Sequence, residues 1–134
     1  MVDPTLVVPQ AIALSAANAD NVGANFTWSP VTATNGDMFQ TTGKEVVLLR
    51  HADAGELIVT VYSNACSQGF TTVHNMVKHM QAGTGTETFS AIGPFSQSHW
   101  GQTIGTYTNA VKILCAGTLA ATEIAVVQFT EVGN

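Results

Sequence analysis

Four histidines are the side chains in this sequence best suited to acid–base or metal chemistry: His51, His74, His79 and His99. Imidazole is a common metal ligand and titrates near neutral pH. His74 and His79 are five residues apart, and on a strand an odd offset places two side chains on opposite faces. His51 beside Asp53 imitates a base with its orienting carboxylate, but both fall at the expected mouth of a hairpin, where exposed polar residues are common. We therefore predict structural roles for the four histidines and no metal site.

The other reactive groups form no familiar catalytic pattern. The nine carboxylates are spread thinly, without the paired arrangement of a glycosidase. Glu45 and Glu56 are expected to face each other across a predicted hairpin or to flank its strands as solubilising charges. No Gly-x-Ser-x-Gly elbow is present, and "GTGTE" (83–87) lacks the lysine and the following helix of a phosphate-binding loop. The sequence predicts neither an enzyme nor a cofactor.

The two cysteines, Cys66 and Cys115, are expected to be free and buried. The opening "MVDPTLVVPQ" has no basic segment and no long apolar core, so it does not resemble a secretory signal, and disulfides belong mainly to exported chains. No run of residues reaches the roughly 18 apolar positions that a membrane helix needs. We predict no membrane contact.

The charge balance argues against nucleic acid as a partner. The formal net charge is −5, and the four basic residues, Lys44, Arg50, Lys78 and Lys112, are scattered. Affinity for nucleic acid depends on clustered lysine and arginine. Only 10% of the residues are charged, against roughly 25% in an average soluble domain. Part of this weakly charged surface is therefore expected to be covered by a partner.

Most of the chain has the residue pattern of β-strands. "VVLLR" (46–50) is a continuous apolar run, which suits a strand covered on both faces. "ELIVTVYS" (56–63) alternates, with Leu57, Val59 and Val61 on one side. "AVKILCAG" (110–117) alternates as well, with Val111, Ile113 and Cys115 inward and Lys112 outward. The strand in "TETFSAIGPF" (86–95) is expected to end at Gly93-Pro94, because proline cannot donate to a sheet ladder.

These runs predict one all-β domain. The strands at 45–51 and 56–63 are expected to form a hairpin through "ADAG", and those at 110–117 and 123–130 a second through "GTLAAT". With weaker strands at 10–17, 25–29 and 73–81, about eight short strands are expected, separated by turns. That pattern is typical of an antiparallel β-sandwich, here expected to be jelly-roll-like. The domain spans 11–134 and follows an extended N-terminal arm, 1–10.

Four aromatic side chains leave two interpretations open. Trp28, Trp100, Tyr62 and Tyr107 could form a stacking platform for sugars, as in carbohydrate-binding sandwiches. Alternatively, they are core or interface anchors in a chain with few other large residues. Burial is the common fate of aromatic rings, so the second interpretation is favoured.

Three stretches taken together resemble the small β-sandwich proteins that decorate or cement the capsids of tailed bacteriophages. They are "NGDMFQTTGKEVVLLRHADAGELIVTVYS" (35–63), "IGPFSQ" (92–97) and the closing "VKILCAG…EIAVVQF". Proteins of that type commonly carry "DGD-x-F…G-(K/R)", an apolar strand ending in a basic residue, and a late "IGPF" turn. The corresponding residues are Asn35-Gly36-Asp37, Phe39, Gly43-Lys44, Arg50 and Ile92-Gly93-Pro94-Phe95. The resemblance covers residues 35–129.

The resemblance implies a virion structural protein on the capsid exterior, made in the host cytoplasm. Its expected partners are the major capsid protein and further copies of itself, possibly as a trimer, and the type has no catalytic residues. The proline-containing N-terminus is expected to extend onto a neighbouring subunit. Two alternatives stay open: a carbohydrate-binding or adhesion module, and a small hydrolase built on the histidines. The candidate partner contacts are Val2, Pro4, Leu6, Val8, Trp28 and Trp100.

Overall fold

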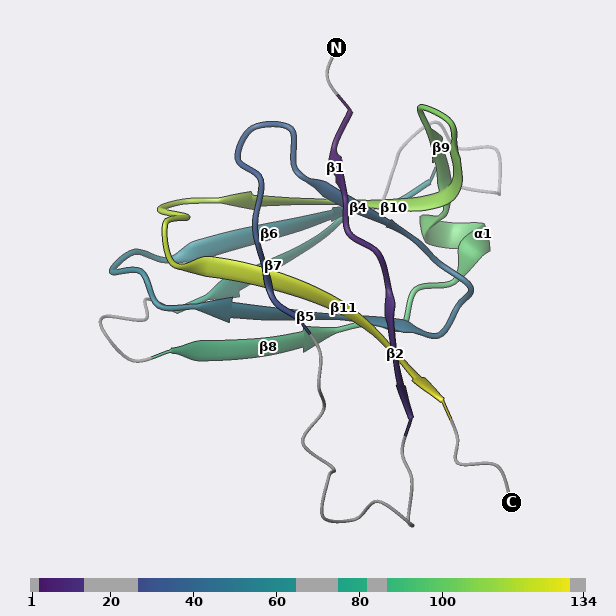
Figure 1. The fold of residues 1–134 in the computed structure, drawn as a ribbon. Helices are drawn as coiled ribbons and strands as arrows, with labels where there is room; N and C mark the ends of the chain where they lie inside the picture. Colours follow the sequence, from purple (N-terminus) through teal and green to yellow (C-terminus); the bar gives the residue numbers. More distant parts are fainter. Residues whose placement is uncertain (1–2, 14–26, 65–74, 82–86, 131–134) are drawn as a thin grey trace.

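The computed structural model describes residues 3–13, 27–64, 75–81 and 87–130, and this part of the chain forms two facing β-sheets (Figure 1). The first sheet has the strand order β1 (Thr5–Leu6), β4 (Asp37–Gln40), β10 (Tyr107–Ala116), β6 (Leu57–Tyr62) and β7 (Met76–Met80), with β9 (Gln102–Ile104) also paired to β10. The second sheet has the order β2 (Gln10–Ala13), β11 (Thr122–Thr130), β5 (Glu45–His51) and β8 (Thr88–Ile92), with β3 (Ser29–Pro30) also paired to β11. One helical turn, α1 (Gln97–Trp100), precedes β9.

This architecture confirms the predicted all-β, sandwich-like fold. The described residues contain eleven strands rather than about eight, because the short strands β1, β4 and β9 carry too few alternating residues to stand out in the sequence. Most neighbouring strands are antiparallel, but β1 pairs parallel to β4 and β2 pairs parallel to β11. Both sheets are therefore mixed. The jelly-roll description stays a prediction.

The two predicted hairpins are wrong. β5 pairs with β11 and β8 in the second sheet, whereas β6 pairs with β10 and β7 in the first. In the same way, β10 belongs to the first sheet and β11 to the second. The short connections are arches that carry the chain across the sandwich. Alternation fixes which face of a strand is buried, but it does not identify the neighbouring strand.

The core lies between the sheets and contains the residues that the alternation predicts to face inward. β5 contributes the fully buried Val47 and Leu49, but Val46 and Leu48 on its other face are half-buried, so the prediction that this run is covered on both faces is correct for one face only. The predicted inward sides of the other two strands are confirmed: Leu57, Val59 and Val61 on β6, and Val111, Ile113 and Cys115 on β10. Cys115 is free, as expected, and Cys66 lies outside the described residues.

The described part of the N-terminal arm lies along its own chain. The amide of Thr5 donates to the Gly36 carbonyl at 3.0 Å, and that of Val7 donates to the Met38 carbonyl at 2.8 Å. Val7 is only 7% exposed and belongs to the core. The segment then crosses to the second sheet, where Gln10 starts β2 (Figure 1). Contact between this arm and a neighbouring subunit stays a prediction.

The residues that carry the capsid-protein resemblance lie in turns and in the core. Gly36 has φ +77°, and a Cβ there would meet the Ile113 carbonyl oxygen at 2.6 Å. Gly93 has φ +127°, and a Cβ there would lie 2.9 Å from the Glu45 carbonyl oxygen. The side chains of Phe39 and Phe95 are buried and contact each other edge to face. β8 ends at Ile92, directly before the Gly93-Pro94 pair, as predicted.

Candidate functional site

The three histidines that the structure describes do not come together in a catalytic or metal site. His51 is fully buried, His79 lies exposed on β7 with Nδ1 3.2 Å from Glu56 Oε1, and His99 contacts the Trp100 ring on α1. His74 lies outside the described residues. Within the described ranges, no group of three histidine, cysteine or acidic side chains is arranged to hold a metal ion.

His51 braces the two arches of the sandwich. The expectation that it is exposed at a hairpin mouth is wrong, because the arch folds the β5–β6 connection over its ring. Nε2 lies 2.7 Å from the Gly55 carbonyl and must be the donor there, while Nδ1 lies 2.7 Å from Thr122 Oγ1. That hydroxyl also lies 3.0 Å from Asp53 Oδ2. With no exposed surface, the His51 ring cannot touch a substrate.

Glu45 also departs from its predicted role. Its side chain is buried in the turn between β4 and β5, and it neither faces Glu56 nor solubilises the strand. It accepts hydrogen bonds from the amides of Thr42 and Lys44 at 2.8 and 3.1 Å, and from the Thr42 hydroxyl at 2.7 Å. Glu45 is therefore a structural acceptor that holds the turn.

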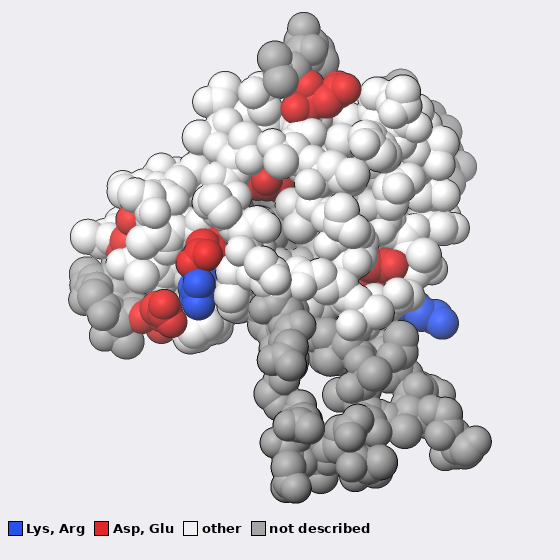
Figure 2. Space-filling view, in the orientation of Figure 1, with Lys and Arg blue, Asp and Glu red and all other residues white. Residues whose placement is uncertain are grey.

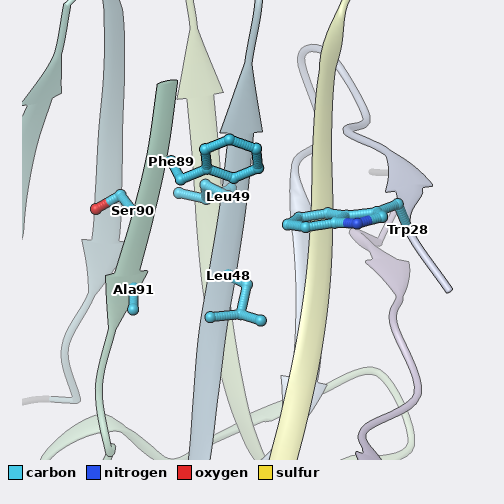
Figure 3. Close-up of a pocket in the computed structure, with 6 residues that line it drawn as sticks. All are labelled: Trp28, Leu48, Leu49, Phe89, Ser90 and Ala91. Carbon is cyan, nitrogen blue, oxygen red and sulfur yellow. The ribbon is translucent and has the colours of Figure 1, made fainter. Parts of the chain in front are cut away.

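An apolar hollow lies on the outer face of the second sheet near β8. Its volume is about 320 Å³, and the outer-face side chains that line it are those of Trp28, Leu48, Phe89 and Ala91. Ser90 also lies along the hollow, but it is paired with the core residue Leu49, so its side chain starts on the inner face. The rings of Trp28 and Phe89 flank β5, and Leu48 and Ala91 form the adjoining floor (Figure 3). The ring centroids are 6.5 Å apart. We call these four residues the apolar groove.

Strand register explains why the apolar groove forms here. Residues paired across a sheet share a face, and β5 places Leu48 opposite Ala91 and Arg50 opposite Phe89. Small Ala91 beside large Phe89 leaves the hollow open. The sequence analysis did not select Phe89. Its position in the strand was the available signal. Phe89 comes three residues before the inward-facing Ile92, so alternation places its large ring on the outer face.

The charges beside the groove are already paired. The guanidinium of Arg50 lies 4.8 Å from the centre of the Trp28 ring and forms an ion pair with Glu123. Its Nε donates to Glu123 Oε1 at 3.1 Å. A cation held by a carboxylate and an aromatic face offers little attraction to a charged ligand. The groove is therefore suited to apolar contact.

A second hollow separates the edges of the two sheets. It has a volume of about 230 Å³ and is lined by β7 and β8 residues, including Lys78, His79, Thr88 and Phe89. Phe89 and Ser90 line both hollows. β8 and β7 are the last strands of their sheets along this border.

The four rings proposed as a sugar platform are not brought together. Trp28 lies over the second sheet, whereas Tyr62 and Tyr107 are on strands of the first. Trp100 packs edge to face against Phe95, 5.5 Å between centroids, and joins the core. Among the described residues no two of these four rings are in contact with each other.

The candidate partner contacts fall into different environments. Pro4 is buried, Leu6 and Trp28 are half-buried, and Trp100 packs against the core. Val8 is 67% exposed between β1 and β2. Val2 lies outside the described residues.

Comparison with known proteins gives no assignment. No family model, curated protein or solved structure matches the chain. In the described ranges no helix has the length and apolar character to cross a membrane. The functional argument therefore depends on the surface itself.

Proposed function

We propose that this chain is a virion structural protein that decorates or stabilises a phage capsid by binding the lattice of the major capsid protein. The resemblance of residues 35–129 to capsid decoration proteins supports this function, as does the sandwich-like fold. This function requires binding to another protein surface, which depends on apolar contacts and few unpaired charges.

The observation that carries the proposal is the character of the exterior. In the part of the chain that the structure describes, three large apolar side chains stand exposed, Val8, Val77 and Phe89, at 67%, 54% and 64%. Val8 lies between β1 and β2, Val77 on β7 and Phe89 on β8. Figure 2 shows few charged side chains on the face it draws, with wide uncharged areas between them. Separate apolar contacts suit a protein that touches several neighbours in a shell, where many copies multiply a weak contact.

Co-sedimentation with particles tests this function. Capsids stripped of accessory proteins are mixed with increasing amounts of the chain, and we expect saturable binding at a fixed copy ratio. Val8→Lys, Val77→Lys and Phe89→Lys are compared one at a time, since each removes one exposed apolar contact and leaves the core intact. At least one should weaken binding roughly tenfold or more, as buried anchors at interfaces do. Non-saturable binding, or three variants that all bind like the wild type, would contradict the proposal.

A carbohydrate-binding or adhesion module is the second candidate, favoured by the pair of rings in the apolar groove. Sugars stack on aromatic faces, and Trp28 and Phe89 provide two. Against it, the side chains of the apolar groove are almost entirely apolar, and sugar hydroxyls need several hydrogen-bond partners. Saturable binding on a glycan array that Trp28→Ala abolishes would favour this candidate. Trp100→Ala is a poor probe because it removes a core contact.

A further inference from the structure

The two edge strands of the sandwich differ in how they are protected. On β7, Lys78 is paired in register with Val59, a core residue, so its side chain starts toward the inside of the sandwich. A charge pointing inward at a sheet edge hinders pairing with another strand. β8 contains Thr88, Phe89, Ser90, Ala91 and Ile92, with no charge and no proline. Among the described residues, β5 is its only partner.

We propose that β8 pairs antiparallel with β8 of a second copy of this chain, across a two-fold axis at Ser90. A two-fold axis through an antiparallel strand pair matches each residue with its mirror position about the centre. Centring on Ser90 uses all five residues and keeps the inner and outer faces of both copies aligned. Phe89 of each copy then lies opposite Ala91 of the other, on the outer face.

This register joins the apolar surfaces of the two copies at the β8 edge. Figure 3 shows the Phe89 ring reaching from β8 toward its own β5, so each ring must turn toward the partner strand to make the contact. Paired side chains on adjacent strands are about 5 Å apart at Cβ, and the turned ring then packs on Ala91 of the other copy, beside Leu48. Each copy offers one exposed ring and one hollow beside a small residue. A surface with both halves of a contact is self-complementary, as a two-fold interface requires.

The charges favour a second copy as the occupant. A two-fold axis brings like charges of the two copies together, so a self-pairing strand should carry none, and β8 has none. Arg50, the nearest cation on the outer face, is already paired with Glu123. The same two-fold pairing of β7 would bring Lys78 of one copy close to Lys78 of the other. A hydrophilic ligand such as a sugar would meet almost entirely apolar side chains in this groove.

Sedimentation velocity without capsids tests the association apart from the proposed function. The wild type is measured from about 1 to about 500 μM, because five paired residues form a small interface and a weak dimer is expected. The average mass should rise from one chain toward two. Phe89→Lys should weaken the dimer roughly tenfold or more, whereas Val77→Lys, an equal change on the other edge strand, should not. A wild type that stays monomeric or forms trimers, or two variants with equal effects, would overturn the proposal.

A cysteine cross-link tests the register. Residues paired directly across antiparallel strands have Cα atoms about 4.5 to 5.5 Å apart, within the range of a disulfide. Under mild oxidation, Ser90→Cys should yield a linked dimer well above the background of the wild type. Val77→Cys should stay at that background. A Ser90→Cys protein that links no better than Val77→Cys would refute pairing about Ser90 even if the chain dimerises.

Discussion

The buried carboxylate of Glu45 lies 2.8 Å from the amide nitrogen of Thr42, in the turn that carries the chain from the first sheet to the second. The same turn is tied to the late Gly-Pro segment, because the Thr41 hydroxyl donates to the Phe95 carbonyl at 2.7 Å. Gln97 Nε2 adds a bond to the Thr41 carbonyl at 2.9 Å. Two of the three stretches that carry the capsid-protein resemblance, 35–63 and 92–97, therefore meet beside this carboxylate.

Glu45→Gln should lower the free energy of unfolding by about 1–3 kcal/mol at neutral pH, because an amide nitrogen cannot accept the bonds that one carboxylate oxygen receives. Burial alone would raise the pKa of Glu45. The hydrogen bonds from Thr42 and Lys44 together lower it by a larger amount, so the net pKa is below the ordinary 4.5. This contribution is present above pH 4.5 and is lost as the pH falls through the lowered pKa. Urea unfolding against pH measures both effects.

The control for this change is Glu56→Gln, the same substitution at an exposed carboxylate. It should alter stability by less than about 0.5 kcal/mol. If both variants shift the urea midpoint equally, the hydrogen bonds of the turn do not explain the role of Glu45.

Asp37→Asn should stabilise the protein at neutral pH. Burial raises the pKa of Asp37, although bonds from Thr32 oppose the shift, and Oδ1 is buried without a partner in the described chain. Folding therefore favours the protonated form of Asp37. The contribution of this group to stability is fully present below the ordinary pKa of 3.8 and is lost as the pH rises through the raised pKa. Asparagine removes this charge and keeps an oxygen to accept from Thr32.

We expect a gain of about 1 kcal/mol for Asp37→Asn at pH 7, shrinking as the pH falls toward 4. Urea unfolding at the two pH values provides the measurement. The same charge also contributes, after burial, to raising the pKa of the neighbouring Cys115 thiol to about 12. In the variant the pKa of the native thiol should fall, because one of its two causes is removed. A loss of stability at pH 7 would show that the carboxylate has a stabilising partner.

The alternation in the sequence predicted which residues face the core, but not which strands are neighbours. Leu57 and Val111 face inward as expected, because a residue's face depends on local spacing. The five-residue connection between β5 and β6 is short enough for either a hairpin or an arch. The choice is made by distant partners, since β5 pairs with residues more than seventy positions later, such as Arg50 with Glu123.

The candidate site depends on the same distant pairing. Phe89 is one apolar residue in a short strand, and its exposure follows from β8 lying at the end of a sheet. The sequence does pick out Trp28, but its position beside Arg50 requires the fold. The prediction that His51 is exposed was wrong for the same reason, because an arch buries the ring that a hairpin would have left at the surface.

Thr122→Val should weaken the contact between the two arches. The lost hydroxyl leaves His51 Nδ1 and Asp53 Oδ2 each without one neighbour, and we expect a loss of about 1–3 kcal/mol in unfolding free energy. Ala52 donates to the Ala121 carbonyl at 3.1 Å between the same arches. Amide hydrogen exchange at Ala52 should therefore accelerate more than exchange in the core strands.

An exposed threonine gives the matched comparison for Thr122. Thr108→Val changes the same side chain at an exposed position of β10, and its unfolding free energy should stay within about 0.5 kcal/mol of the wild type. Unchanged exchange at Ala52 in Thr122→Val would mean that the backbone alone holds the arches together.

Deleting residues 1–9 should destabilise the sandwich, because this segment supplies β1 and the core side chain of Val7. Loss of one large aliphatic core residue alone costs about 2–4 kcal/mol, and two backbone bonds to β4 go with it. Thermal unfolding measures the effect. Val8→Lys is the comparison, since Val8 is 67% exposed and its replacement should leave the melting temperature nearly unchanged. If the truncated chain melts like the wild type, the N-terminal segment is not part of the folded domain in solution. If Val8→Lys weakens particle binding without changing the melting temperature, Val8 itself contacts the partner, which the deletion cannot establish because it also removes core contacts.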